Sequence, residues 1–288
     1  MSIFVKHVDE YPGLLEKIGD APKQLYYRGE WNPGLFEKCL AVVGTRRMTQ
    51  YGKRVTEQLV GEVAAAGVTI VSGFMYGVDA TAHKAALGAG GKTIAVMPCG
   101  IDVIHPAYQA DLCQEILDKG GLVLSEYEGT HPATNWTFPR RNRIVAGLSK
   151  ATLVVEAGED SGALITANLA KKYGRKVFAV PNPLTSAVSQ GVNQLLKEGA
   201  ELVGSAKDIL QYYGLRGSAE QRGTKTRNYA EIKGELEQKI VQQLDREPLQ
   251  IDELARRLLV SASQVGAAVS MLQLDGVISE EQGKFYAH

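Results

Sequence analysis

The stretch LAVVGTRR, residues 40–47, indicates the fold class most directly, because a short apolar run is followed at once by a glycine, a threonine and two arginines. Four apolar residues that end at a glycine turn are typical of a strand buried inside a sheet. Similar runs lie further along the chain, at residues 68–71, 93–97, 122–124, 153–156 and 177–180. Helical patterns separate several of them, at residues 51–66, 108–119 and 165–173. This alternation predicts an α/β fold with a parallel sheet and helices on both faces.

Glycine-containing or polar turns follow several of these strands. In a parallel sheet, ligands bind beyond the carboxyl ends of the strands, where the strand order reverses. The turns expected at this edge contain Gly44, Ser72 with Gly73, Gly100, Glu126, and Glu156 with Gly158. We therefore expect one binding region at this edge of the sheet.

Two domains are expected. Residues 1–215 carry the sheet pattern, with residues 1–35 as a short N-terminal extension, and the polar residues 216–235 have the composition of a linker. The remaining residues, 236–288, contain three helical patterns, at 236–244, 251–258 and 263–274, and then two short strands, around 276–278 and 283–286. Three helices followed by a two-stranded wing predict a small C-terminal winged-helix domain.

Composition neither supports nor excludes nucleic acid as a partner. The chain has 288 residues, 44% of them hydrophobic, with 32 basic and 32 acidic side chains and a formal net charge of zero. A polyanion must therefore bind to a local basic patch. Three widely spaced cysteines without a Cys-x-x-Cys pair argue against a disulfide framework and fit a reducing cytoplasm. We expect a soluble, cytoplasmic protein, because no segment approaches the ~20 apolar residues that span a bilayer.

The clearest candidate for a binding site is FPRRNRIVAG, residues 138–147. Where a helix is expected to begin, it places an aromatic ring beside an amide and three guanidinium groups: Phe138, Asn142, Arg140, Arg141 and Arg143. Arginines pair with phosphate oxygens, a helix N-terminus adds N–H donors, and a ring offers a face for base stacking. The alternative is a solvated helix start with surface ion pairs. A second basic turn elsewhere in the sheet domain favours the phosphate interpretation.

That second turn contains Gly44, Thr45, Arg46 and Arg47. The glycine lets the backbone approach a phosphate, and Thr45 adds a hydroxyl donor. A tight turn between a strand and a helix would explain the glycine equally well, but it would not explain the arginines.

A third turn begins at Ser72 and Gly73. Either Phe74 or Tyr76 could stack on a base there. Equally, the segment could be a turn capped by Asp79 near a helix start.

A fourth turn contains Ser161 and Gly162, where a helix is expected to begin. The N–H groups of a helix start bind anions. Because Glu159 and Asp160 oppose a highly charged anion, a single phosphate or a nucleoside fits better than a triphosphate.

The sequence lacks the common catalytic and cofactor motifs. Residues 88–93 end like a Walker A loop, but Ala86 replaces its first glycine and a strand follows it. There is no Gly-x-Gly-x-x-Gly after a strand, no histidine pair with metal spacing and no serine in a nucleophile elbow. Asp79, Asp102 and Glu126 could be hydrolytic carboxylates, although capping is the commoner role. We expect no cofactor, no metal ion and no enzymatic activity.

The C-terminal domain is a poor candidate for reading DNA sequence. Residues 236–288 hold five basic side chains against eight acidic ones, and the expected reading helix carries only Gln264 and Gln273 as polar base-reading groups. A protein-contact or regulatory role is at least as plausible as groove binding. We therefore expect nucleic-acid binding to reside in residues 1–215.

Taken in order, these motifs resemble the DNA-processing protein A family (DprA, also called Smf) of bacterial natural transformation. The resemblance covers most of residues 11–213, and the tail is similar to the family's winged-helix domain. Its motifs are Tyr11-Pro12, residues 25–29, Gly44-Thr45-Arg46, Ser72-Gly73, residues 100–106, residues 138–143, Val155-Glu156-Ala157, Ser161-Gly162, and Gly191 with Asn193.

The resemblance implies an extended Rossmann-like, mostly parallel sheet that binds single-stranded DNA, forms a homodimer and loads the recombinase RecA. Arg46 and the backbone of Gly44 and Thr45 would then grip phosphate, and Phe138 would meet a base. Arg141, Asn142 and Arg143 would line the groove, with Ser161 and Gly162. Apolar residues of the last helices, Leu195, Leu196, Ile209, Leu210, Tyr212 and Tyr213, are the expected dimer contacts, although core packing explains most of them.

The chain departs from the family pattern in three places. A bulky segment, residues 74–76, replaces a smaller one, and an N-terminal helical domain found in many members is absent. Asn182 stands where glycine is usual and tolerates a left-handed backbone. The alternative function is a nucleotide-binding enzyme of the related phosphoribohydrolase group, but its Pro-Gly-Gly-x-Gly-Thr motif is missing. A winged-helix transcription regulator is a third reading, against which the acidic tail argues.

Overall fold

The computed structural model describes residues 3–7, 10–215, 232, 234–245, 247–281 and 283–287. The chain divides into two compact units, Met1–Gln221 and Arg222–His288. Most of the expected linker, residues 216–235, lies outside the described residues. No described helix is both long and apolar enough to cross a bilayer.

The first unit is built on a nine-stranded sheet. Its order is β1 (Phe4–His7), β2 (Gln24–Gly29), β6 (Leu122–Tyr127), β5 (Thr93–Gly100), β4 (Thr69–Ser72), β3 (Cys39–Val43), β7 (Ala151–Val154), β8 (Lys176–Ala179) and β9 (Glu201–Leu202). All pairings from β6 to β9 are parallel, whereas β2 pairs antiparallel with both β1 and β6. The mostly parallel sheet is confirmed. Strand order reverses between β3 and β7, which is where such a sheet binds ligands.

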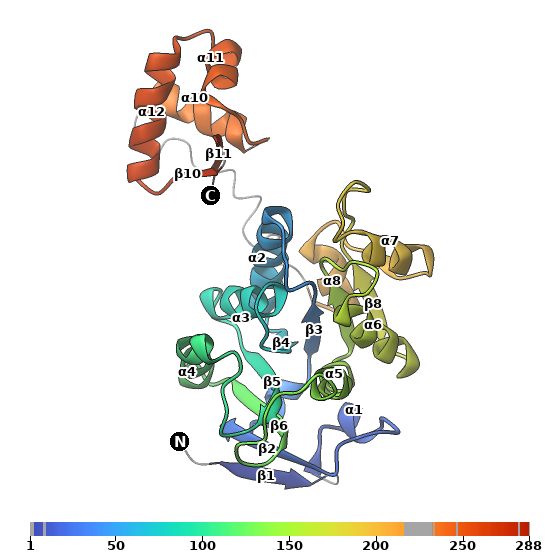
Figure 1. Cartoon of the computed structure of the whole chain (residues 1–288). Helices are drawn as coiled ribbons and strands as arrows, with labels where there is room; N and C mark the ends of the chain where they lie inside the picture. Colours follow the sequence, from blue (N-terminus) through green and yellow to red (C-terminus); the bar gives the residue numbers. More distant parts are fainter. Residues whose placement is uncertain are drawn as a thin grey trace. The chain divides into compact units, whose positions relative to one another are not determined.

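Helices cover both faces of the sheet, as predicted (Figure 1). One face carries α2 (Gln50–Ala65), α3 (Val78–Gly88), α4 (Ala110–Asp118) and α8 (Ala206–Tyr212). The other carries α1 (Gly13–Glu16), α5 (Thr137–Leu148), α6 (Gly162–Lys172) and α7 (Gln190–Lys197). Leu40 and Val42 of β3 pack toward α2 and α3, and Ala41 and Val43 pack toward α5 and α6. Two buried faces explain why this strand is apolar at every position.

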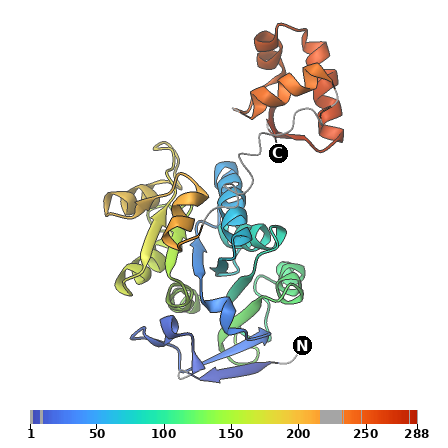
Figure 2. The same ribbon diagram turned by 180° about the vertical axis from the view of Figure 1, so that it is seen from behind.

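The N-terminal extension contributes structure that the sequence patterns did not predict. Strands β1 and β2 form an antiparallel edge of the sheet, seen in blue in Figure 2. Asn182 also differs from expectation, since its backbone is not left-handed. Its side-chain amide instead donates to the carbonyl oxygens of Val155 and Val180, at 2.7 and 2.9 Å. Phe74 is left-handed, with φ of 61°.

Glu156, just after β7, holds the loop between β3 and α2. Its backbone oxygen accepts a hydrogen bond from the Thr45 N–H at 2.7 Å, and its buried carboxylate accepts one from the Thr49 N–H at 2.9 Å. The Thr49 hydroxyl also donates to this carboxylate and caps α2 by accepting from the Gly52 N–H. A carboxylate at a helix N-terminus is favoured by the exposed N–H groups. The loop that carries Arg46 is therefore fixed to both sides of the strand-order reversal.

The second unit has the predicted winged-helix fold. It contains α10 (Glu235–Leu244), α11 (Ile251–Leu258), α12 (Ala262–Leu274) and the wing strands β10 (Ile278–Glu281) and β11 (Lys284–Ala287). Its own core includes Ile240, Leu254, Val269 and Phe285. Ser261 caps α12 in a reciprocal capping box with Gln264. Three helices and a wing close around one small hydrophobic core.

Two glycines of α2 provide a test of how much the contact between Glu156 and the start of α2 contributes to stability. We call this contact the Glu156 lock. A Cβ at Gly52 would overlap the Glu156 carboxylate, whereas at Gly61 the nearest atom is 4.0 Å away. We predict that Gly52→Ala lowers the free energy of unfolding by about 1 to 3 kcal/mol through overpacking. Gly61→Ala should raise it by about 0.5 to 1 kcal/mol, because alanine is the better helix former.

Urea denaturation followed by tryptophan fluorescence measures this, since both tryptophans, Trp31 and Trp136, belong to the first unit. Equal effects of the two substitutions would contradict the lock.

Candidate functional site

A cavity of about 720 Å³ opens where the strand order reverses, and we call it the switch-point groove. Turns after β3, β4 and β7 meet there with the starts of α5 and α6. Of the residues expected from sequence, ten line it: Gly44, Thr45, Arg46, Arg47, Gly73, Phe138, Arg141, Asn142, Ser161 and Gly162. Thus four turns that are far apart in sequence converge at one edge of the sheet.

Exposed Arg46 and half-buried Phe138 lie against each other in the groove. The Arg46 guanidinium carbon lies 4.8 Å from the centroid of the Phe138 ring and 5.9 Å from that of Tyr76. Within the described part of the chain, neither Arg46 nor Arg47 has an ion-pair partner. A cation held over an aromatic face in this way can meet a phosphate and leave the ring near a base.

Tyr76 contributes to the groove, and Phe74 does not. The Phe74 ring is fully buried, 5.7 Å from the His83 ring, so it cannot stack on a ligand. Asp79 lies in the first turn of α3, and its carboxylate accepts a hydrogen bond from the Met75 N–H at 3.3 Å. The capped-turn interpretation therefore describes most of this segment, and Tyr76 alone is available as a stacking face.

Arg141 serves the fold more than a ligand. Its guanidinium is buried and donates to two backbone oxygens, that of Gly73 just after β4 and that of Val96 within β5. A side chain at Gly73 would collide with it, which explains the glycine. Burial lowers the pKa of Arg141 to about 10, opposed by the nearby Asp79 carboxylate. Burial in turn raises the pKa of Asp79, opposed by Arg141. Arg141 therefore lines the groove, as expected, but its guanidinium is already bonded to the backbone.

Asn142 and Ser161 join the two helix starts beside the groove. The Asn142 amide donates to the Gly162 carbonyl at 3.3 Å and accepts from the Arg141 Nε at 3.2 Å. The Ser161 hydroxyl caps α6 by accepting from the Ala163 N–H at 3.3 Å. Both side chains thus hold the α6 N-terminus at the groove wall. Glu159 and Asp160 line the same wall.

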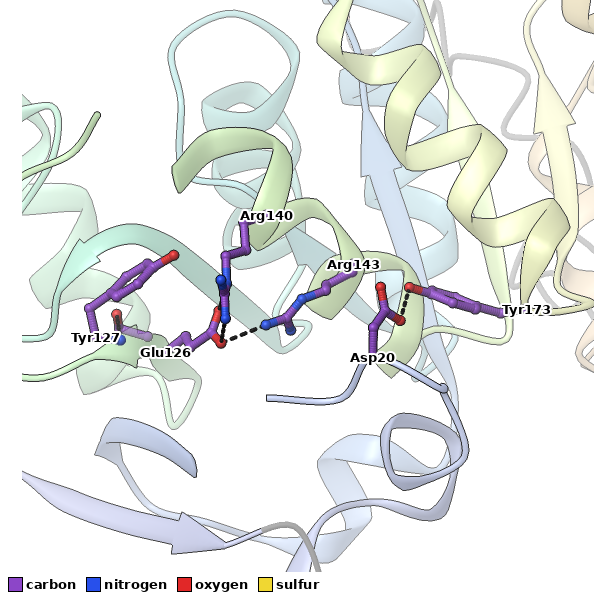
Figure 3. A network of polar contacts seen from close by, with 7 residues as sticks. Asp20, Glu126, Tyr127, Arg140, Arg143 and Tyr173 are labelled. Carbon is purple, nitrogen blue, oxygen red and sulfur yellow. Dashed lines mark hydrogen bonds and ion pairs between the residues drawn. The ribbon is translucent and has the colours of Figure 1, made fainter. Parts of the chain in front are cut away.

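Three of the expected groove residues lie elsewhere. Ser72 is buried and donates to the Val42 carbonyl oxygen at 2.6 Å, joining β4 to β3. Arg140 and Arg143 lie on the other side of α5 from Phe138 and Asn142, because successive helical residues turn by about 100°. Both pair with Glu126, at 3.2 Å for Arg140 and 2.5 Å for Arg143 (Figure 3). Neither arginine lines the switch-point groove.

Among the described residues, each of the three carboxylates considered as hydrolytic is buried or ion-paired. Asp102 pairs with Arg28 at 3.0 Å, Glu126 pairs with two arginines, and Asp79 is buried. No group of three or more His, Cys, Asp or Glu side chains suited to a metal ion occurs among the described residues. His105 approaches the Phe138 ring edge-on at 5.8 Å, and its pKa is lowered by burial and by the charges of Arg46 and Arg141.

Family models match both units of the chain. A model described as DNA recombination-mediator protein A matches residues 2–214, and a DprA winged-helix domain model matches residues 225–284. Among curated proteins, the chain is 44% identical over 201 residues to Protein Smf of Escherichia coli, covering 70% of this chain and 54% of that one. It is 42% identical over 202 residues to the DNA processing protein DprA of Streptococcus pneumoniae, covering 70% and 71%.

Solved structures agree with these matches. DNA processing protein A of Streptococcus pneumoniae superposes with a TM-score of 0.68 at 39% identity, covering 73% of this chain and 74% of that one. DNA processing protein A of Helicobacter pylori, a protein with a unique single-stranded DNA binding mode, superposes with a TM-score of 0.67 at 34% identity, covering 74% and 96%. In its sheet unit and its winged-helix unit alike, the chain belongs to the DprA/Smf family of DNA processing proteins.

Proposed function

We propose that this protein binds single-stranded DNA in the switch-point groove, without an enzymatic step, and so protects incoming DNA during natural transformation. The observation that carries the proposal is the Arg46 guanidinium, unpaired among the described residues and lying over the ring of Phe138. Arg46 and Arg47 would meet phosphates, and Phe138 and Tyr76 would stack on bases. The relative from Helicobacter pylori supports this substrate class.

The arrangement favours single strands over duplex. Stacking needs a base whose face is open, which a paired and stacked duplex does not offer. The winged-helix unit adds little positive charge, and its reading helix α12 carries no basic side chain. Binding should therefore be insensitive to base sequence and should arise in the first unit.

We also propose that the protein loads the recombinase RecA and works as a homodimer. Family membership is the support for both. Leu195, Ile209 and Leu210 pack in the core, and the Tyr213 hydroxyl donates to the Cys39 carbonyl oxygen at 2.6 Å. The dimer contact therefore falls to other apolar side chains at this end of the sheet.

The phosphoribohydrolase alternative is not supported by these comparisons. Such an enzyme needs a carboxylate free to act on the substrate, and Asp79, Asp102 and Glu126 are buried or paired. An assay for base release from nucleotides, run beside the binding experiments, distinguishes the two functions.

Arg46→Ala tests the phosphate contact. We expect weaker binding to every single-stranded oligonucleotide, whatever its sequence, and a salt slope flatter by about 0.7, the value for one phosphate contact on a single strand. Fluorescence anisotropy across a salt series measures both quantities. Arg256→Ala, an exposed arginine of the second unit, is the matched control and should change neither. Unchanged binding by Arg46→Ala, or equal affinity of the wild type for duplex and single strands, would rule out the proposed groove.

Phe138→Ala tests the stacking contact. Removing the ring should cost about 1 to 3 kcal/mol of binding free energy and leave the salt slope nearly unchanged, because no charge is lost. Phe138→Tyr keeps the aromatic face and should bind almost as the wild type does. A loss of slope in Phe138→Ala without a loss of affinity would contradict the stacking role.

The dimer contact can be tested at the edge strand β9. Leu202 is 55% exposed there, and Tyr212 is 47% exposed and packs on Phe178 of the neighbouring strand β8 with ring centroids 5.7 Å apart. Static light scattering at micromolar concentration should show a dimer, and Leu202→Arg with Tyr212→Arg should yield a folded monomer. A wild-type monomer, both with and without DNA, would overturn the dimer.

A further inference from the structure

We propose that a second cavity, on the other side of the start of α5, is a phosphate site for the same DNA strand after it leaves the switch-point groove. This cavity has a volume of about 920 Å³, and we call it the Arg143 hollow. Arg140 and Arg143 of α5, Lys23, and Glu126 and Tyr127 of β6 contribute to its lining. The inference rests on the proposed binding of single-stranded DNA.

Two buried donors lack partners at this hollow. Arg143 is only 7% exposed, and within the described residues its Nη1 has no hydrogen-bond acceptor. The hydroxyl of Tyr127, another residue of the lining, is also buried without a partner among those residues. Buried polar groups almost always have a partner, so two orphan donors at one cavity indicate a missing acceptor. A phosphate oxygen accepts from both a guanidinium and a phenol.

The charge of the hollow also fits one phosphodiester. Three cations, Arg140, Arg143 and Lys23, face two carboxylates, Glu126 and Asp20, so these five groups sum to one positive charge. Glu126 orients both guanidinium groups by pairing with each, and Asp20 accepts a hydrogen bond from the Tyr173 hydroxyl at 2.6 Å (Figure 3). A phosphodiester carries one negative charge, and it would neutralise the excess.

The two cavities are neighbours that share one ridge. Pro139 and Ile165 line both of them, on α5 and α6 respectively. Trp136, one turn before Arg140, is 53% exposed and meets the Tyr127 ring edge-on at 5.8 Å. An apolar ridge, with an exposed indole at the start of the same helix, suits the sugars and bases that must pass between two phosphate sites. A single strand is therefore a better occupant than a free anion, which would need no ridge.

Oligothymidylates from about two to about twelve nucleotides long separate the sites, because only the longer ones can reach both. We expect Lys23→Ala to weaken binding of the long oligonucleotides about three- to tenfold and to flatten their salt slope by about 0.7. Binding of the shortest ones, held in the groove alone, should not change. Arg143→Lys, which keeps the charge beside Glu126 but removes Nη1, should behave in the same way. Lys84→Ala, an exposed lysine on α3 and on the opposite face of the sheet, is the control and should match the wild type.

Glu126→Gln provides a test of opposite sign. Removing this carboxylate leaves Arg140 and Arg143 uncompensated, so long oligonucleotides should bind more tightly with a steeper salt slope. If the cluster has a purely structural role, Glu126→Gln should bring no gain in affinity for long oligonucleotides. The absence of that gain would overturn the second site. So would Lys23→Ala matching Lys84→Ala at every length. If inorganic phosphate alone saturates the hollow while Lys23→Ala spares long strands, the occupant is a free anion. If the wild type binds no single strand at any length, the proposed function itself has failed.

Discussion

The contact between Glu156 and the start of α2 is the constraint on which the binding region depends. In this parallel sheet the carboxyl ends of β3 and β7 lie side by side, and the chain leaves them in opposite directions, which opens a gap between the two connections. Glu156 closes this gap from β7 by accepting N–H donors of the loop that follows β3, through its backbone oxygen and its carboxylate. The donors would otherwise be unsatisfied at the helix start. As a result the Arg46 loop is part of the sheet architecture, and Arg46 meets Phe138 in a preformed arrangement.

Arginines a few positions apart in one helix have quite different roles. Arg141 is buried and donates to two backbone carbonyl oxygens, beside β4 and within β5. Arg140 and Arg143 pair with the carboxylate of Glu126 on the other side of α5. The exposed cation at the groove comes instead from the other turn, at Arg46. Helical geometry explains the division, since neighbours in sequence point in different directions around the axis. Basic residues in a motif therefore act in several places, only one of which is the groove.

Sequence patterns predicted the parallel strands well, because each is buried on both faces and must be apolar throughout. They also placed Gly44, Gly73 and Gly158 at one edge, since strand ends define that edge. They could not place Arg143, whose position depends on where α5 begins and how it is rotated against the sheet. The edge strands β1 and β2 were missed, because a short strand with one partly exposed face has a weak apolar pattern. Phe74 was one of two candidates for stacking, but its backbone is left-handed and its ring is fully buried in the core.

The seat of Arg141 has a mechanical consequence. A strand lying over the start of α5 would pull on that helix whenever the DNA came under tension. The guanidinium of Arg141 ties this same turn of the helix to two strands of the sheet through backbone carbonyls, and Asn142 ties it sideways to α6. Force applied at Phe138 would thus be transmitted through Arg141 to the backbone beside β4 and within β5.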